Sequence, residues 1–105
     1  MDAHTLIAKR GLDHHGFYSY VPGLLKYYTT LQIQERIAPR PRMSLVGKDD
    51  RMCPIEGVEH LAHGLQQKYK EAGVSEHFQS VITTGGHMET LQMRVLWKEF
   101  LSRHL

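Results

Sequence analysis

The sequence predicts an α/β fold whose parallel sheet is incomplete. Two short segments, 43–46 and 78–83, have the composition of strands, and each is followed by a longer segment with the apolar period of a helix. Strands and helices in alternation are typical of parallel sheets, which normally contain more strands than two. The chain has no internal repeat that could supply them. We therefore expect one partial domain over 1–105, with a loop-rich lead-in over 1–28 and the α/β region over 29–105.

The lead-in shows one clear turn signal, Val21-Pro22-Gly23, after which a short helix can begin near Leu24. Thr29 or Thr30 can cap the next short helix, because a threonine oxygen can accept from the free amides of a first turn. Pro39 ends that helix, since a residue before proline disfavours the helical region.

The first strand ends at Gly47, and Pro54 suits the opening of the next helix, where its missing N–H costs nothing. Gly73 suits the end of that helix as a left-handed cap. Between them, apolar residues recur at steps of three and four: Val58, Leu61, Ala62, Leu65, Tyr69 and Ala72. This period predicts an amphipathic helix.

The second strand is rich in β-branched residues towards its end and leads into the tight turn Gly85-Gly86. The last helix is predicted from Glu89 to about Leu105. Its inward residues are expected to be Leu91, Val95, Leu96, Phe100 and Leu101, with Trp97 packed as well.

Composition excludes several classes of protein. Hydrophobic residues make up 41% and charged residues 23% of the chain, and the net charge is +2 with scattered basic residues, so neither disorder nor a nucleic-acid partner is predicted. No apolar run approaches the roughly 20 residues that span a bilayer, so no membrane contact is predicted. A start without a leader and the single Cys53 indicate a cytoplasmic setting, unless Met1 is internal to a longer protein.

Two turns carry the candidate chemistry, each directly after the carboxyl end of a predicted strand. The first contains Asp49 and Asp50, and the second contains His87. Sites in open α/β sheets gather outside these strand ends, so an acid on one turn and a histidine on the next can come within hydrogen-bonding reach. The carboxylate would hold one imidazole N–H, and the other ring nitrogen would be free to take a proton from a nucleophile.

These features resemble the end of an α/β-hydrolase, in the branch of dienelactone hydrolases and acetyl-xylan esterases. The similar stretch runs from Ile37-Ala38-Pro39-Arg40-Pro41 through a strand, Gly-x-x-Asp with a proline four residues on, a helix, a second strand and Gly-His followed by Glu-Thr. Residues 11–16 and 20–25 are similar to a segment found before this region in some of those proteins.

The resemblance implies that Asp50 is the acid and His87 the base of a catalytic triad, with Asp49 as the alternative acid. It also implies a serine or cysteine nucleophile on a Gly-x-Ser-x-Gly elbow upstream. No serine of this chain lies in such an elbow, and Cys53, between Met52 and Pro54, does not either. The family's oxyanion-hole loops lie upstream as well.

Plainer roles exist for the same residues. Asp50 can cap the helix that begins near Pro54, and His87 can be an ordinary loop residue. His60 and His63 lie three apart on one predicted helix, but no third ligand accompanies them, so no metal site is predicted. The tyrosines can line a substrate pocket or simply pack: Tyr18, Tyr20, Tyr27 and Tyr28.

The leading hypothesis is an incomplete serine ester hydrolase that supplies the triad acid and histidine but lacks the nucleophile. Such a chain is expected to be inactive by itself, to need no cofactor, and to act on a small-molecule ester once an N-terminal half completes it. A second hypothesis is a non-catalytic interaction module that oligomerises, or pairs with a separate chain, through open sheet edges. A third is a small enzyme that uses Cys53 with His87.

Overall fold

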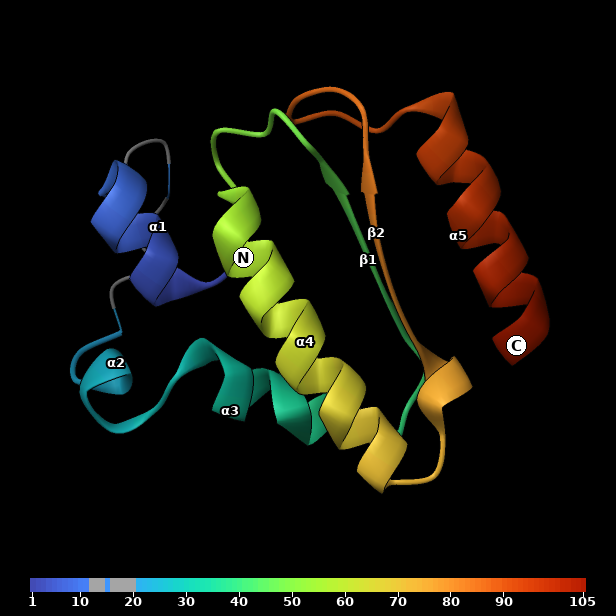
Figure 1. Ribbon diagram of the computed structural model, residues 1–105, viewed down its shortest axis with the longest axis horizontal. Coiled ribbons are helices and arrows are strands. Elements are labelled where there is room, and N and C mark those ends of the chain that lie inside the picture. Colours follow the sequence, from blue (N-terminus) through green and yellow to red (C-terminus); the bar gives the residue numbers. More distant parts are fainter. Residues whose placement is uncertain (12–14, 16–20) are drawn as a thin grey trace.

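Two parallel strands form the centre of the molecule in the computed structural model, which describes residues 1–11, 15 and 21–105. Strand β1 is Arg42–Gly47 and strand β2 is Phe78–Thr83. Arg42 lies opposite Phe78 and Gly47 opposite Thr83, so both strands end at the same edge (Figure 1). The α/β class predicted from the sequence is confirmed, and each described strand has one edge without a partner.

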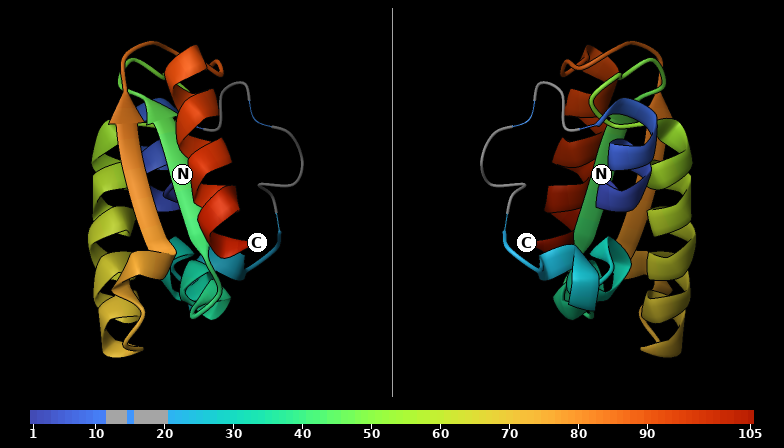
Figure 2. Two further views of the ribbon diagram at one scale, coloured as in Figure 1. Left: turned by 90° about the vertical axis from the view of Figure 1, so that its right-hand side faces the viewer. Right: turned by 90° about the vertical axis from the view of Figure 1, so that its left-hand side faces the viewer.

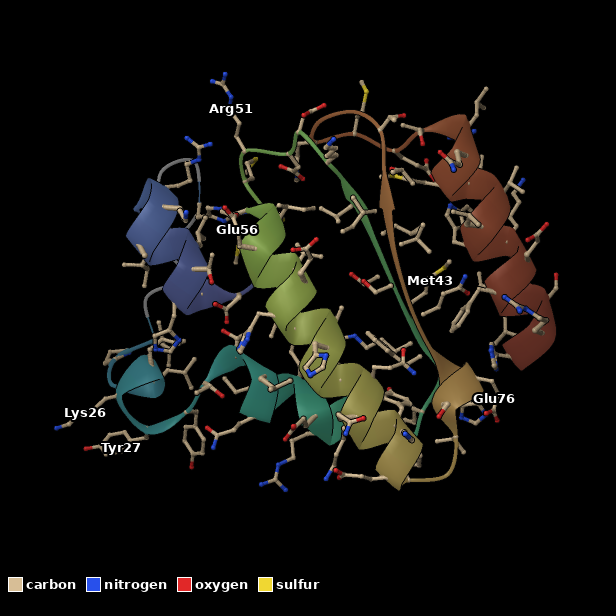
Figure 3. All side chains as sticks on the ribbon, viewed as in Figure 1. Lys26, Tyr27, Met43, Arg51, Glu56 and Glu76 are labelled. Carbon is tan, nitrogen blue, oxygen red and sulfur yellow. The ribbon has the colours of Figure 1, made fainter. Side chains whose placement is uncertain are left out.

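The two long helices lie on opposite faces of this sheet. Helix α4 (Ile55–Glu71) lies behind β2, and helix α5 (Leu91–His104) lies over β1 (Figure 2). The β1–α4–β2 connection therefore covers one face, while α5 returns along the other. The successive residues of β1 alternate between these layers, and Met43 points towards α5 (Figure 3).

Helix α4 carries the buried core. It begins after Pro54 and ends two residues before Gly73, whose φ of 75° suits a glycine. Leu65 and Tyr69 pack against Phe78 of β2, and the two aromatic rings stack with centroids 5.4 Å apart. The amphipathic pattern of the sequence thus predicted both this helix and the face it buries.

The lead-in is more helical than predicted. Besides α2 (Leu24–Tyr27), it contains α1 (Ala3–Arg10), in a stretch predicted to be loop. Asp2 caps α1, accepting from the backbone N–H of Thr5 at 2.9 Å and from its hydroxyl at 2.7 Å. The cap was visible in the sequence, but the short helix buries one side chain completely, Leu6, and so shows no apolar period.

The start of helix α3 (Thr30–Gln34) shows which of the two candidate threonines caps it. Thr29 is its cap and forms a reciprocal capping box with Gln32. Thr30 instead accepts from the backbone N–H of Ala3 at 3.0 Å, which ties the start of α1 to α3. Two short 3-10 helices complete the described elements, η2 (Glu35–Ile37) and η3 (Ser75–His77).

The predictions for the last helix need correction. Thr90 caps α5, so the helix begins at Leu91 rather than at Glu89. Met93 and Phe100 are buried, but the predicted inward residues Leu91, Val95 and Leu101 are 80%, 56% and 40% exposed. At about 100° per residue, Leu91 and Val95 lie on the side of α5 opposite Met93 and Phe100, which face the sheet. The side of α5 turned away from the sheet therefore carries an exposed apolar stripe.

Within the described ranges, no helix combines the length and the apolar character needed to cross a bilayer.

Candidate active site

The turns after β1 and β2 are joined by backbone hydrogen bonds. Lys48 N–H donates to Thr83 O at 2.7 Å, and Asp49 N–H donates to Gly85 O at 2.9 Å. Gly47 makes this junction possible, because a Cβ at that position would overlap the carbonyl oxygens of Gly85 and Gly86. The two turns are therefore joined at the carboxyl edge of the sheet.

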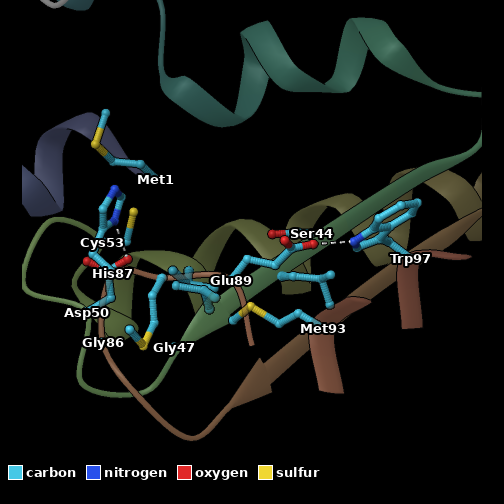
Figure 4. Close-up of a pocket in the computed structure, with 14 residues that line it drawn as sticks. Met1, Ser44, Gly47, Asp50, Cys53, Gly86, His87, Glu89, Met93 and Trp97 are labelled. Carbon is cyan, nitrogen blue, oxygen red and sulfur yellow. Dashed lines mark hydrogen bonds and ion pairs between the residues drawn. The ribbon is translucent and has the colours of Figure 1, made fainter. Parts of the chain in front are cut away.

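Asp50 and His87 meet across this junction. Oδ2 of Asp50 lies 2.9 Å from Nδ1 of His87, and Oδ1 accepts from the backbone N–H of Met52 at 2.8 Å. The Asp50 side chain is 6% exposed, whereas that of His87 is 64% exposed. The two labelled side chains lie together at one end of the group drawn in Figure 4. The predicted contact between an acid and His87 is present, and Asp50 rather than Asp49 makes it.

This geometry leaves one imidazole nitrogen available for chemistry. With Nδ1 bound to the carboxylate, His87 carries its proton there and presents Nε2 as an acceptor, which has no hydrogen-bond partner in the described part of the chain. A buried carboxylate behind an exposed imidazole is the arrangement of an oriented general base. The pair can accept a proton at Nε2 and return it to a leaving group.

A cleft of about 500 Å³ begins at this pair and runs along β1. Four consecutive residues of β1 line it, Ser44–Gly47. Consecutive residues point to opposite faces of a sheet, so only a cleft along the strand edge can touch all four. At the far end lie Glu89 and Trp97, which hydrogen-bond to each other (Figure 4). Neither residue is a site candidate from the sequence, because their spacing of eight crosses a helix start and follows no simple period.

Cys53 also lines the cleft, beside Asp50 and His87. Burial raises the pKa of its thiol, and the neighbouring negative charge of Asp50 raises the pKa further. The thiol is therefore protonated at neutral pH, and a thiol is a much weaker nucleophile than a thiolate. These conditions weigh against the hypothesis of a Cys53–His87 enzyme.

His15 contacts the turn that carries Asp50, whereas His60 and His63 lie on α4. Of the neighbours His14 and His15, the first falls outside the described residues, while His15 Nε2 donates to Met52 O at 3.2 Å. His60 and His63 are exposed on α4. Across residues 1–11, 15 and 21–105, no three histidine, cysteine or acidic side chains gather as a metal site would require.

Of the four tyrosines considered as possible pocket residues, the structure describes two. Tyr18 and Tyr20 fall outside the described residues. Tyr27 and Tyr28 are largely exposed, and Tyr27 points away from the body of the molecule (Figure 3), near α2 and far from the strand ends that carry Asp50 and His87.

Comparison with known proteins gives one clear relative. The chain is 42% identical over all its 105 residues to a Bacillus subtilis (strain 168) protein named "Putative hydrolase YtaP". The match covers 100% of this chain but only 35% of YtaP, so the chain spans about a third of that relative's length. No protein-family model matches the chain. No solved structure matches it either. The whole chain is therefore similar to one part of a larger protein that is named as a hydrolase.

Proposed function

We propose that this chain is the C-terminal part of a serine ester hydrolase of the α/β-hydrolase type, in which Asp50 and His87 serve as triad acid and base. The contact of 2.9 Å between a buried carboxylate and an exposed imidazole is the observation that carries the proposal. The name of YtaP supports the reaction class, and its greater length supports the view that the rest of the site lies outside this chain.

The proton path follows from the pair. Nε2 of His87 takes the proton of the nucleophile as its oxygen attacks the ester carbonyl, and then gives that proton to the departing alkoxide, leaving an acyl-enzyme. A water molecule, deprotonated in the same way, then releases the acid and restores the nucleophile. Asp50 stabilises the imidazolium that forms between these transfers. The nucleophile and the oxyanion-hole donors come from the remainder of the protein.

The β1 edge and the α5 stripe are the surfaces on which we expect that remainder to bind. The cleft beside Ser44–Gly47 has room along the free edge of β1, and α5 extends over β1 with Leu91 and Val95 exposed. The stripe lies on the side of α5 away from the sheet, so a separate segment packed on that side would cover it. An extended segment paired with β1 would satisfy its free backbone groups. It would also place new side chains next to His87, at the mouth of the cleft.

A hybrid protein tests the catalytic role. We expect the chain by itself to show no turnover of a nitrophenyl ester, because it lacks an activated nucleophile. A hybrid in which it replaces the matching third of YtaP should hydrolyse the ester and label with a serine-directed fluorophosphonate, with native YtaP measured in parallel. His87→Ala should lower kcat of the hybrid about a thousandfold or more.

His63→Ala is the matched control, since His63 is exposed on α4 and remote from the pair; it should leave kcat unchanged. Activity of the hybrid that survives His87→Ala would refute the proposal. So would His87-dependent turnover by the isolated chain. A folded hybrid that is inactive while native YtaP is active would equally count against it.

The same surfaces favour a second candidate, a non-catalytic module that binds another copy through its open strand edges. For that function, the isolated chain should sediment as a dimer or larger species at micromolar concentration, and Ile82→Lys on the open strand β2 should shift it towards monomer. A stable monomer with a cooperative melt would exclude self-association as its role.

A further inference from the structure

Glu89, two residues beyond His87, is bound to two side chains of α5. Its Oε1 accepts from Trp97 Nε1 at 2.6 Å, and its Oε2 accepts from Arg94 Nη2 at 2.9 Å. Both carboxylate oxygens are thus engaged by donors three residues apart on one helix face. The carboxylate also precedes the first turn of α5, where the helix dipole favours a negative charge.

The His87 loop is consequently held on both sides. On the strand side, Gly85 O accepts from Asp49 N–H at 2.9 Å, which joins the loop to the β1 turn. Between Gly86 and Glu89 the backbone makes only a local bond, Met88 N–H to Gly86 O, and the Met88 side chain is 66% exposed. Beyond His87, the first side chain that anchors the loop to another element is Glu89.

We propose that Glu89 is a positioning residue for His87: its bonds to Trp97 and Arg94 hold the loop against α5 and so keep the imidazole in line with Asp50. This inference rests on the proposed function. It adds to that function a connection from the catalytic base to α5, the helix whose exposed stripe is expected to meet the rest of the protein.

We expect the loss of the Glu89 contacts to displace His87 rather than to lower the free energy of unfolding. The Glu89 and Arg94 side chains are about half exposed, and exposed ion pairs contribute little to folding free energy. An exposed imidazole held at Nδ1 by one carboxylate can still swing when its loop is released, and small displacements of a catalytic group cost much of its rate.

Trp97 offers a direct probe, because it is the chain's single tryptophan and its indole N–H gives one NMR resonance. In the 105-residue chain, Glu89→Ala should shift this resonance and broaden the His87 ring signals. Glu89→Gln, which keeps an acceptor for the indole but loses the charge facing Arg94, should give a smaller change. Glu99→Ala, at an exposed glutamate on the same helix, should change neither signal.

Acid should release the same contact. Hydrogen bonds from Arg94 and then Trp97 hold the pKa of Glu89 below its usual range, with the charges of Arg94 and Lys98 acting in the same direction. The lowered pKa means that the contact is complete above the usual glutamate pKa, about 4.3, and is lost only as pH falls below it. The indole resonance should move in that acidic window in the wild type and stay flat there in Glu89→Ala.

The YtaP hybrid separates positioning from other roles. Glu89→Ala should lower kcat by about tenfold to a hundredfold with KM unchanged, and Glu89→Gln should recover part of the loss. A raised KM at constant kcat would mean that Glu89 contacts substrate and would overturn the positioning role. An unchanged kcat would also overturn it.

Failure of this inference differs from failure of the proposed function. If His87→Ala abolishes turnover while Glu89→Ala does not affect it, the triad role stands and the positioning role falls. If His87→Ala has no effect on turnover, the triad role falls. Glu89 then has no catalytic role either, whatever the NMR signals show.

Discussion

Asp50→Asn is expected to lower kcat of the YtaP hybrid about 10³- to 10⁴-fold while the protein stays folded. The reason lies in the second hydrogen bond of Asp50. Oδ1 accepts from Met52 N–H at 2.8 Å, so an asparagine must place its carbonyl oxygen there. Its NH₂ group then faces Nδ1 of His87, which has to become the acceptor. The ring proton moves to Nε2, and the nitrogen that should accept the nucleophile's proton is blocked.

The tautomer can be measured without any turnover. In the ¹⁵N-labelled chain, His87 should carry its proton on Nδ1 in the wild type and on Nε2 in Asp50→Asn, and the nitrogen shifts distinguish the two forms. Asp49→Asn is the control, because Asp49 is exposed and its side chain makes no bond to His87. Equal losses in the two variants, or an unchanged tautomer in Asp50→Asn, would remove Asp50 from the proposed triad.

Gly47→Ala should separate the two turns of the site. The new methyl group would overlap the carbonyl oxygens of Gly85 and Gly86, which are backbone atoms and cannot rotate away as a side chain could. The loop must shift, and the bonds from Lys48 N–H to Thr83 O and from Asp49 N–H to Gly85 O are strained with it. We expect a loss of about 1–3 kcal/mol in the free energy of unfolding, the usual cost of overpacking.

Urea unfolding followed by circular dichroism measures that loss, and the His87 ring signals report the broken contact with Asp50. Gly86→Ala provides a control in the same loop, since a Cβ there meets nothing nearer than Asp49 O at 4.0 Å and the glycine has no positive φ. A Gly47→Ala chain as stable as Gly86→Ala would show that the close approach of the two turns is not required.

Local patterns predicted the elements whose signals lie within a few residues. The period of α4 and the strand composition of β1 and β2 are consequences of burial on one face, and they appear directly in the sequence. Helix α1 was missed because a two-turn helix that fully buries only Leu6 has no period to detect. Asp2 is a capping residue, but a capping residue alone is a weak signal for a helix without the tertiary contacts of α1.

The prediction of which α5 residues are buried was wrong for a different reason. The apolar residues of the helix were visible, and Leu91 and Val95 were expected to face inward. The sheet covers only one side of the helix, where Met93 and Phe100 lie, and Leu91 and Val95 point about half a turn away from it. The roles of Asp50 and His87 came from the spacing of the two turns and a resemblance, and their catalytic assignment stays a prediction.

The sequence by itself determined the alternation of strand and helix, and with it the edge at which Asp50 and His87 would lie, because parallel strands end on the same side. Only the tertiary structure decided that Asp50 and not Asp49 reaches the imidazole, and that Glu89 ties the His87 loop to α5. Asp49 and Asp50 are adjacent residues of the same type, so no sequence pattern distinguishes them, and they differ only in the direction of their side chains. That direction is set by contacts between segments far apart in the chain, which no local spacing records.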